Sequence, residues 1–98
     1  MKPLCILPAA ETELGDAPVF YEERREGLGS EFLAAVDEAL DRIAVMPDTF
    51  PRWHPEREYQ CLRLERFPFV SFYLDLQDSV EVVAIAHAKR RPGYWTKR

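Results

Sequence analysis

The sequence predicts an α+β fold in the order β-α-α-β-β-β, with a helix hairpin packed on one face of a small, mostly antiparallel sheet. Three observations support this prediction. Apolar residues recur at helical spacing between residues 10 and 46, whereas those after the proline-rich loop at 46–55 follow strand-like patterns. Two glycines, Gly27 and Gly29, divide the helical part, and a short apolar run precedes it. A chain of 98 residues has room for one domain, residues 1–98.

The first two predicted elements are a strand and a helix. Residues 3–7 contain four consecutive apolar side chains, which is typical of a short buried strand. From Ala10 the apolar residues follow a helical period that ends at Gly27. Pro18 interrupts this pattern, because a proline inside a helix removes a donor and clashes with the carbonyl four residues earlier. We therefore expect the first helix to kink or to begin late, with Asp16 as a candidate N-cap.

The second helix is predicted between the two glycines and Pro47. Its apolar residues recur every three or four positions, and charged residues occupy the other faces. The apolar positions are Leu28, Phe32, Ala35, Val36, Ala39, Leu40 and Ile43. Because Gly27 and Gly29 make a tight corner, we expect the two helices to form an antiparallel hairpin whose acidic surface faces water.

Three strands are predicted after the proline-rich loop, at residues 59–66, 68–75 and 79–87. The first two alternate apolar with mixed side chains, and the third is apolar at both parities, as in a central strand covered on both sides. Gln77 and Asp78 are expected to form the tight turn between the last two strands.

The sheet face opposite the helices is expected to be bare. It would carry Arg63, Phe69 and Tyr73, together with Val83, Ile85 and His87 if the last strand aligns that way. This is a larger apolar and aromatic surface than a monomer normally leaves in water, so we expect a partner to cover it.

Charge is distributed unevenly along the chain. Residues 1–49 carry a net charge of −7 and residues 50–98 a net charge of +3, while residues 88–98 alone carry +5 with no acid. A free nucleic-acid-binding protein is usually basic overall, whereas this chain has a net charge of −4. We therefore expect only local binding of phosphate, or a partner that carries both signs of charge.

Several classes of protein are disfavoured by composition. No apolar run approaches the roughly 20 residues that span a bilayer, and no signal peptide is visible. Cys5 and Cys61 lack a metal-type spacing and are expected to be half-buried free thiols. We therefore expect a cytoplasmic protein without membrane contact, metal or cofactor.

Six short segments form a recognisable series along the chain. They are residues 21–24 (YEER), 27–32 (GLGSEF), 47–51 (PDTFP), 66–73 (RFPFVSFY), 80–87 (VEVVAIAH) and 89–95 (KRRPGYW). In this order, and over nearly the whole chain, they resemble the RelE/ParE superfamily of bacterial type II toxins, also known as plasmid stabilisation proteins. The resemblance implies a growth-inhibiting toxin and a co-encoded antitoxin that neutralises it by wrapping around it.

The resemblance implies one of two activities. ParE-like members poison DNA gyrase without a hydrolytic site, and RelE-like members cut messenger RNA on the ribosome. RNA cleavage by the 2′-hydroxyl requires a base, an acid and cations for the developing charge. His87 could be the base and Tyr94 the acid, with Arg63, Arg90 and Arg91 holding phosphate. Because the chain is acidic overall, the gyrase-directed activity is slightly preferred and RNA cleavage is the alternative.

Each candidate residue also has a structural role open to it. His87 at a strand end is more often a hydrogen-bonded imidazole than a catalyst, and Arg63 could pair with a nearby glutamate on the sheet surface. Tyr94 and Trp95 could fold back and seal the sheet edge. Trp53 is expected to cap the core locally.

The resemblance also predicts how an antitoxin binds. An acidic and apolar antitoxin segment would lie across the bare sheet face and meet the basic tail. The residues expected to contact it are Phe69, Tyr73, Lys89, Arg91 and Trp95. A third possibility is a silent family member that binds an antitoxin without being toxic.

Overall fold

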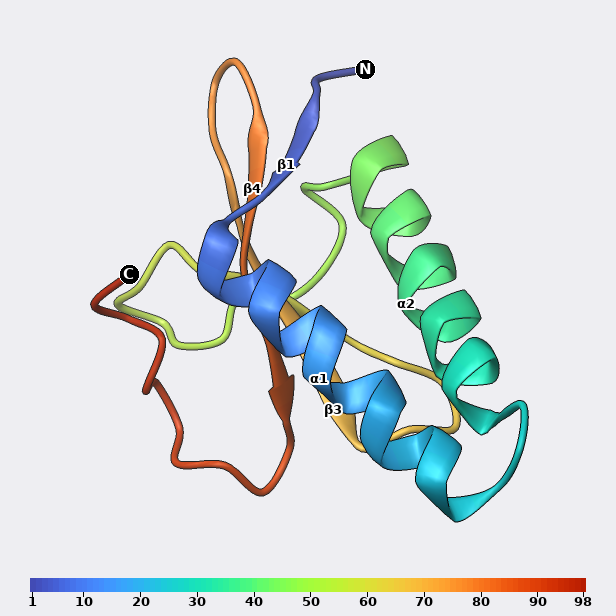
Figure 1. The fold of residues 1–98 in the computed structure, drawn as a ribbon. Coiled ribbons are helices and arrows are strands. Elements are labelled where there is room, and N and C mark those ends of the chain that lie inside the picture. The colour runs from blue at the N-terminus through green and yellow to red at the C-terminus, as the bar shows by residue number, and fades with distance from the viewer.

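The structure, a computed structural model, describes all 98 residues and contains the six elements in the predicted order (Figure 1). They are β1 (Leu4–Ile6), α1 (Pro8–Arg24), α2 (Leu28–Val45), β2 (Gln60–Arg63), β3 (Phe69–Asp75) and β4 (Val80–His87). The sheet has the order β1-β4-β3-β2, in which β1 is parallel to β4 and the other pairs are antiparallel. Both helices lie on the same side of the sheet, so the predicted fold class is confirmed. Neither helix is both long and apolar enough to cross a membrane.

The first helix begins earlier than predicted. Pro8 occupies its first turn, where the missing N–H of proline is harmless, and Asp16 is an exposed residue inside the helix rather than its N-cap. Pro18 lies within the helix without ending it. The apolar residues of α1, among them Ala10 and Tyr21, pack against the core, and this packing outweighs the loss of one hydrogen bond. The prediction of a late start was therefore wrong.

The corner between the helices is formed as predicted. Gly27 has a φ of 87°, a left-handed conformation that favours glycine. Gly29 lies so close to α1 that an added Cβ would be 2.7 Å from the carbonyl oxygen of Pro18. Both glycine N–H groups donate to the carboxylate of Glu22, at 2.9 and 3.0 Å, and these hydrogen bonds lower the pKa of Glu22. Glu22 therefore holds together the corner that the two glycines permit.

The two faces of β3 were assigned the wrong way round, whereas Arg63 of β2 lies on the face opposite the helices, as expected. Tyr73 is fully buried on the face covered by the helices, and Phe69 packs there against Phe32 with ring centroids 4.9 Å apart. The opposite face carries Val70 and Phe72 instead. Alternation shows which residues of a strand share a face, but it does not show which face the helices cover.

A β-bulge changes the alternation within β4. Phe72 pairs with Ala84 and Tyr73 with Val82, so Val83 has no partner on β3. As a result, Val83 and Ile85 pack into different cores, although their spacing would place them on one face of a regular strand. The predicted grouping of Val83 with Ile85 was therefore wrong.

The face opposite the helices is not bare, because the chain covers it with its own loop and tail. Trp95 is 1% exposed and stacks on Phe72 with ring centroids 4.4 Å apart. Trp53 and Tyr59, from the segment that precedes β2, contact Trp95 edge-on at 4.9 and 4.7 Å. Figure 1 shows the C-terminal segment beside this loop. A second core thus forms where a partner was expected.

The edge strand β1 is less buried than predicted. Its burial alternates only between intermediate and exposed, and Cys5 is exposed, because β1 pairs on one side alone. Cys61 is half-buried, as expected. Both cysteines are free thiols.

Candidate functional site

The C-terminal tail, residues 88–98, is a series of turns packed onto the sheet. The N–H of Ala88 donates to the Pro68 carbonyl at 2.7 Å, and the N–H of Thr96 donates to the Gly93 carbonyl at 3.0 Å. Gly93 has a φ of 78°, and an added Cβ would lie 3.1 Å from the ring of Trp53. Gly93 therefore permits both the left-handed turn and the close packing that brings Trp95 into the second core.

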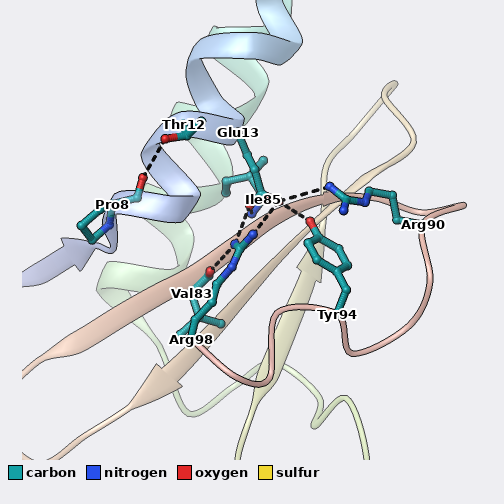
Figure 2. Close-up of polar contacts among 8 residues, drawn as sticks. All are labelled: Pro8, Thr12, Glu13, Val83, Ile85, Arg90, Tyr94 and Arg98. Carbon is teal, nitrogen blue, oxygen red and sulfur yellow. Dashed lines mark hydrogen bonds and ion pairs between the residues drawn. The ribbon is translucent and has the colours of Figure 1, made fainter.

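A single carboxylate ties the tail to the first helix (Figure 2). Glu13 of α1 accepts hydrogen bonds from the Ile85 N–H at 3.0 Å, from the Arg98 guanidinium at 2.9 Å and from the Tyr94 hydroxyl. The guanidinium of Arg90 lies 3.9 Å from the same carboxylate. The side chain of Glu13 is only 14% exposed, so its charge is compensated almost entirely by protein groups.

The position of this network follows from the short length of β1. The N–H of Leu7 donates to the Val82 carbonyl at 3.0 Å, and the chain then turns into α1, which leaves the rest of this edge of β4 without a strand. Beyond that point the N–H of Ile85 donates to Glu13, and the carbonyl of Val83 accepts from Arg98 at 3.0 Å. Two side chains thus satisfy the edge groups that β1 does not reach.

Tyr94 is held as a hydrogen-bond donor within this network. The guanidinium carbon of Arg90 lies 3.7 Å from the ring centroid and that of Arg98 lies 5.2 Å from it, both close enough for cation–π attraction. Burial, and then the hydrogen bond that the phenol donates to Glu13, raise the pKa of Tyr94 to about 12. The phenol therefore stays protonated and bound to the carboxylate at neutral pH.

We expect the titration of Tyr94 to report this contact. The wild type and Tyr94→Phe are titrated with base and compared by ultraviolet absorbance. The phenolate absorbance that only the wild type shows should appear near pH 12 rather than near pH 10. Because the folded-state pKa is raised, the contribution of Tyr94 to stability should be full below pH 10 and should be lost between about pH 10 and 12. A difference spectrum that appears near pH 10 would contradict the contact with Glu13.

The predicted catalytic residues lie around one pocket. Arg63 at the end of β2, His87 at the end of β4, and Arg90, Arg91 and Tyr94 of the tail line a hollow of about 140 Å³. The structure therefore brings together the five residues considered for RNA cleavage. Arg63 forms no ion pair, so the alternative in which it pairs with a glutamate on the sheet surface was wrong.

The residues expected to contact an antitoxin are not brought together on one surface. Tyr73 lies under the helices, and its hydroxyl donates to the Pro47 carbonyl. Trp95 is buried in the floor of the pocket, and Phe69 is partly buried on the helix side. Only Lys89 and Arg91 are exposed. The continuous binding face predicted from these residues is therefore wrong, because the helices cover Phe69 and Tyr73 and Trp95 is packed against the opposite face of the sheet.

His87 has one ring nitrogen already occupied. Its Nδ1 accepts a hydrogen bond from the backbone N–H of Lys89 at 3.1 Å, and its ring packs edge-on against Phe69 at 5.2 Å. With Nδ1 as the acceptor, a neutral imidazole carries its proton on Nε2. His87 is therefore a hydrogen-bonded imidazole at the end of β4.

The sequence interpretation missed Glu13 and treated Arg98 only as part of the charged tail. A signal for Glu13 was present, since it lies three residues after Ala10 and hence on the same face of α1 as the apolar stripe. A carboxylate on a buried face needs a partner. The tail, with five cations and no acid, was the part of the chain able to supply one.

Comparison with known proteins gives two findings. The family model described as the ParE toxin of the type II toxin-antitoxin system, parDE, matches residues 5–92. Among solved structures, the chain is similar to one of a chromosomal ParDE TA system from P. aeruginosa, with a TM-score of 0.69 and 17% sequence identity. The match covers 91% of this chain and 98% of that chain. No curated protein matches the chain in sequence.

Proposed function

Since the chain belongs to the ParE toxin family of type II toxin–antitoxin systems, we propose that it acts on DNA gyrase through a protein–protein contact rather than by cleaving messenger RNA. Membership of the family makes it the toxin of such a system, with a cognate antitoxin as its partner. What the proposal adds is the target and the manner of inhibition.

The observation that carries the proposal is that the groups a nuclease would use are engaged within the fold. A general acid works best with a pKa near the operating pH, whereas the pKa of Tyr94 is raised to about 12 and its hydroxyl donates to Glu13. A general base at Nδ1 of His87 would first have to give up the N–H of Lys89. Both features favour action through surface contact over proton transfer.

The tail offers a suitable surface for such a contact. Lys89, Arg90, Arg91 and Lys97 are exposed, and no acid interrupts them. Trp95 and Glu13 hold the backbone beneath these side chains in place. A surface that is ordered before binding loses less conformational entropy on association, and its charge accelerates the encounter with an acidic partner.

One observation favours the RelE-like alternative. Arg63, Arg90 and Arg91 share a pocket with His87 and Tyr94, which is the set of residue types that RNA cleavage requires. The silent member that only binds an antitoxin is the other alternative. Both are distinguished from the proposal by expressing the chain alone in bacteria and measuring DNA synthesis and protein synthesis after induction.

We expect a variant without the acid–base groups to stay toxic. His87→Gln combined with Tyr94→Phe keeps most of the side-chain volume but removes chemistry that typically contributes about 10² to 10⁴ in rate. In the proposed function, this variant still stops DNA synthesis and still inhibits supercoiling by purified gyrase. The proposal fails if the wild type cuts ribosome-bound messenger RNA and this variant does not, or if induction of the wild type has no effect on growth.

Charge reversal in the tail is expected to weaken gyrase inhibition. Lys89→Glu with Arg91→Glu removes the electrostatic contact but leaves the Arg90 and Arg98 contacts with Glu13 in place. Arg52→Glu with Arg57→Glu is the matched control, since it makes the same change in net charge at exposed positions in the loop before β2. If both pairs of substitutions weaken the inhibition of supercoiling equally, the effect comes from total charge, and the tail is not the surface that contacts gyrase.

A further inference from the structure

The exposed side of α2 carries a cluster of acids without partners. Asp37, Glu38 and Asp41 are exposed, lie within five consecutive residues and form no ion pair. Arg42, the one cation of α2, lies with its guanidinium carbon 5.3 Å from the ring centroid of Phe50. Like charges three or four residues apart on a helix repel each other. These three acids, called here the acidic patch, therefore lack any compensating charge.

The tail carries the opposite charge around a hollow of its own. Lys89, Arg91 and Lys97 are exposed and form no ion pair. A hollow of about 320 Å³ is lined by Arg91, Pro92, Gly93, Tyr94, Thr96 and Lys97, with no acid among them. Trp95 anchors the backbone of this segment in the second core. The hollow therefore presents two cations to a carboxylate side chain from another molecule.

The acidic patch and these cations do not meet within one molecule. Figure 1 shows α2 and the tail on opposite sides of α1. The only carboxylate with which tail cations pair is that of Glu13, which lies on α1 and not on α2. A second copy of the chain carries the complementary surface, because its α2 is free to face the tail of the first.

We propose that copies of this chain associate through unlike surfaces, with the acidic patch of one copy against the cationic tail of the next. One carboxylate of the patch would lie in the hollow lined by Arg91 and Lys97. Such a contact is heterologous, so it leaves one free patch and one free tail at the ends of the assembly. Because these surfaces lie on opposite sides of the chain, two copies do not close into a dimer, and the assembly continues into a longer chain or a ring.

The charges near the contact outweigh the net charge of the chain. The net charge of −4 opposes association, but it is spread over the molecule, and charges separated by more than about 10 Å are largely screened at 0.1 M salt. The contact itself brings three unpaired acids to three unpaired cations. Leu33 and Val45, which are 45% and 65% exposed, flank the patch along α2 and add apolar area. Since exposed ion pairs are individually weak, we expect weak, salt-dependent association.

Sedimentation equilibrium of the purified chain tests the proposal. In about 0.01 M salt the mean mass should rise with protein concentration beyond that of a dimer. In about 1 M salt the rise should disappear, since the screening length falls from about 30 Å to about 3 Å. Asp37→Lys with Asp41→Lys, and separately Arg91→Glu with Lys97→Glu, should each weaken association at least about tenfold, because each pair places like charges at the contact.

Each pair of substitutions has a control with the same change in net charge. Glu23→Lys with Glu26→Lys is the control for the patch variant, since both acids are exposed, form no ion pair and lie outside α2. Arg52→Glu with Arg57→Glu is the control for the tail variant. Both controls should associate as the wild type does, and all four variants should melt near its temperature.

An equimolar mixture of the patch variant and the tail variant should recover association. Each variant repels copies of itself, but the new lysines of the first face the new glutamates of the second, and their unchanged surfaces also match. A variant that had lost its fold would not recover on mixing. Recovery would therefore show that these two surfaces meet each other.

Three results would overturn the inference. The first is a wild type that remains monomeric in about 0.01 M salt at protein concentrations up to about 1 mM. The second is equal association of the charge variants and their controls, or a mixture that stays monomeric. The third is a dimer that does not grow with concentration, because a contact between opposite sides of the chain does not close at two copies.

The inference does not rest on the proposed function, because it needs only copies of the chain itself. A chain that inhibits gyrase but stays monomeric would retain the proposed function and lose this inference. A chain that associates through the patch and the tail but leaves gyrase unaffected would do the reverse.

Discussion

Replacing Trp95 with alanine is expected to lower the free energy of unfolding by about 3–5 kcal/mol, the usual range for removal of a large buried aromatic side chain. Trp95 is 1% exposed and contacts the rings of Phe72, Trp53 and Tyr59, so no neighbouring side chain is free to fill the space it leaves. Small domains are stable by about 5–15 kcal/mol, which makes this a large fraction of the total. Urea unfolding followed by circular dichroism measures the change.

The control for Trp95 lies in the same tail. Lys97 is exposed and forms no ion pair, so Lys97→Ala should unfold within about 0.5 kcal/mol of the wild type. If Trp95→Ala unfolds at the same urea concentration as Lys97→Ala, the tail does not form the second core. The sheet face would then be open, as the sequence had suggested.

Replacing Glu13 with alanine is expected to cost about 2–3 kcal/mol and to release the tail. The change removes the acceptor for the Ile85 N–H, the Tyr94 hydroxyl and the Arg98 guanidinium at once, and a buried donor without a partner loses its full solvation energy. Arg98 is 23% exposed and regains water, which keeps the cost below that of a fully buried charge. Hydrogen exchange by NMR should show the Ile85 amide losing protection.

Glu11 provides the comparison for Glu13. It is an exposed acid in the first turn of the same helix, so Glu11→Ala makes the same change in charge without touching the tail. Equal stability of the two variants, with the Ile85 amide still protected in both, would mean that Glu13 does not hold the tail. A selective effect of Glu13→Ala would confirm that this edge of β4 depends on side chains for its hydrogen bonds.

The closed sheet face changes what an antitoxin can contact. A segment laid across Phe69 and Tyr73 would have to displace the helices, which pack over both residues. The exposed alternatives are the hollows around Arg63 and the cationic side chains of the tail. Binding at these places requires no opening of either core, so it avoids the large free-energy cost of unpacking them.

Much of the fold was predictable because its signals are local. The period of α2, the corner at Gly27 and Gly29, and the order of the three later strands each depend on residues close together in the chain. Intrinsic geometry repeats side chains every 3.6 residues in a helix and every two in a strand, so a single sequence is enough to recognise both. The segment motifs likewise pointed to the toxin family that the family model matches over residues 5–92.

The remaining features depended on contacts between distant parts of the chain. Glu13 and Tyr94 are separated by 81 positions in the chain. The arrangement of the site depends on which face of the sheet the helices cover and on where β1 ends. Strand alternation is symmetric between the two faces, so Tyr73 and Phe72 were equally good core residues until α1 and α2 covered one side. The sequence by itself therefore determined the elements, their order and the charged tail. Only the tertiary structure decided that the tail folds back onto Phe72, because that contact depends on packing across the sheet and not on any pattern along the chain.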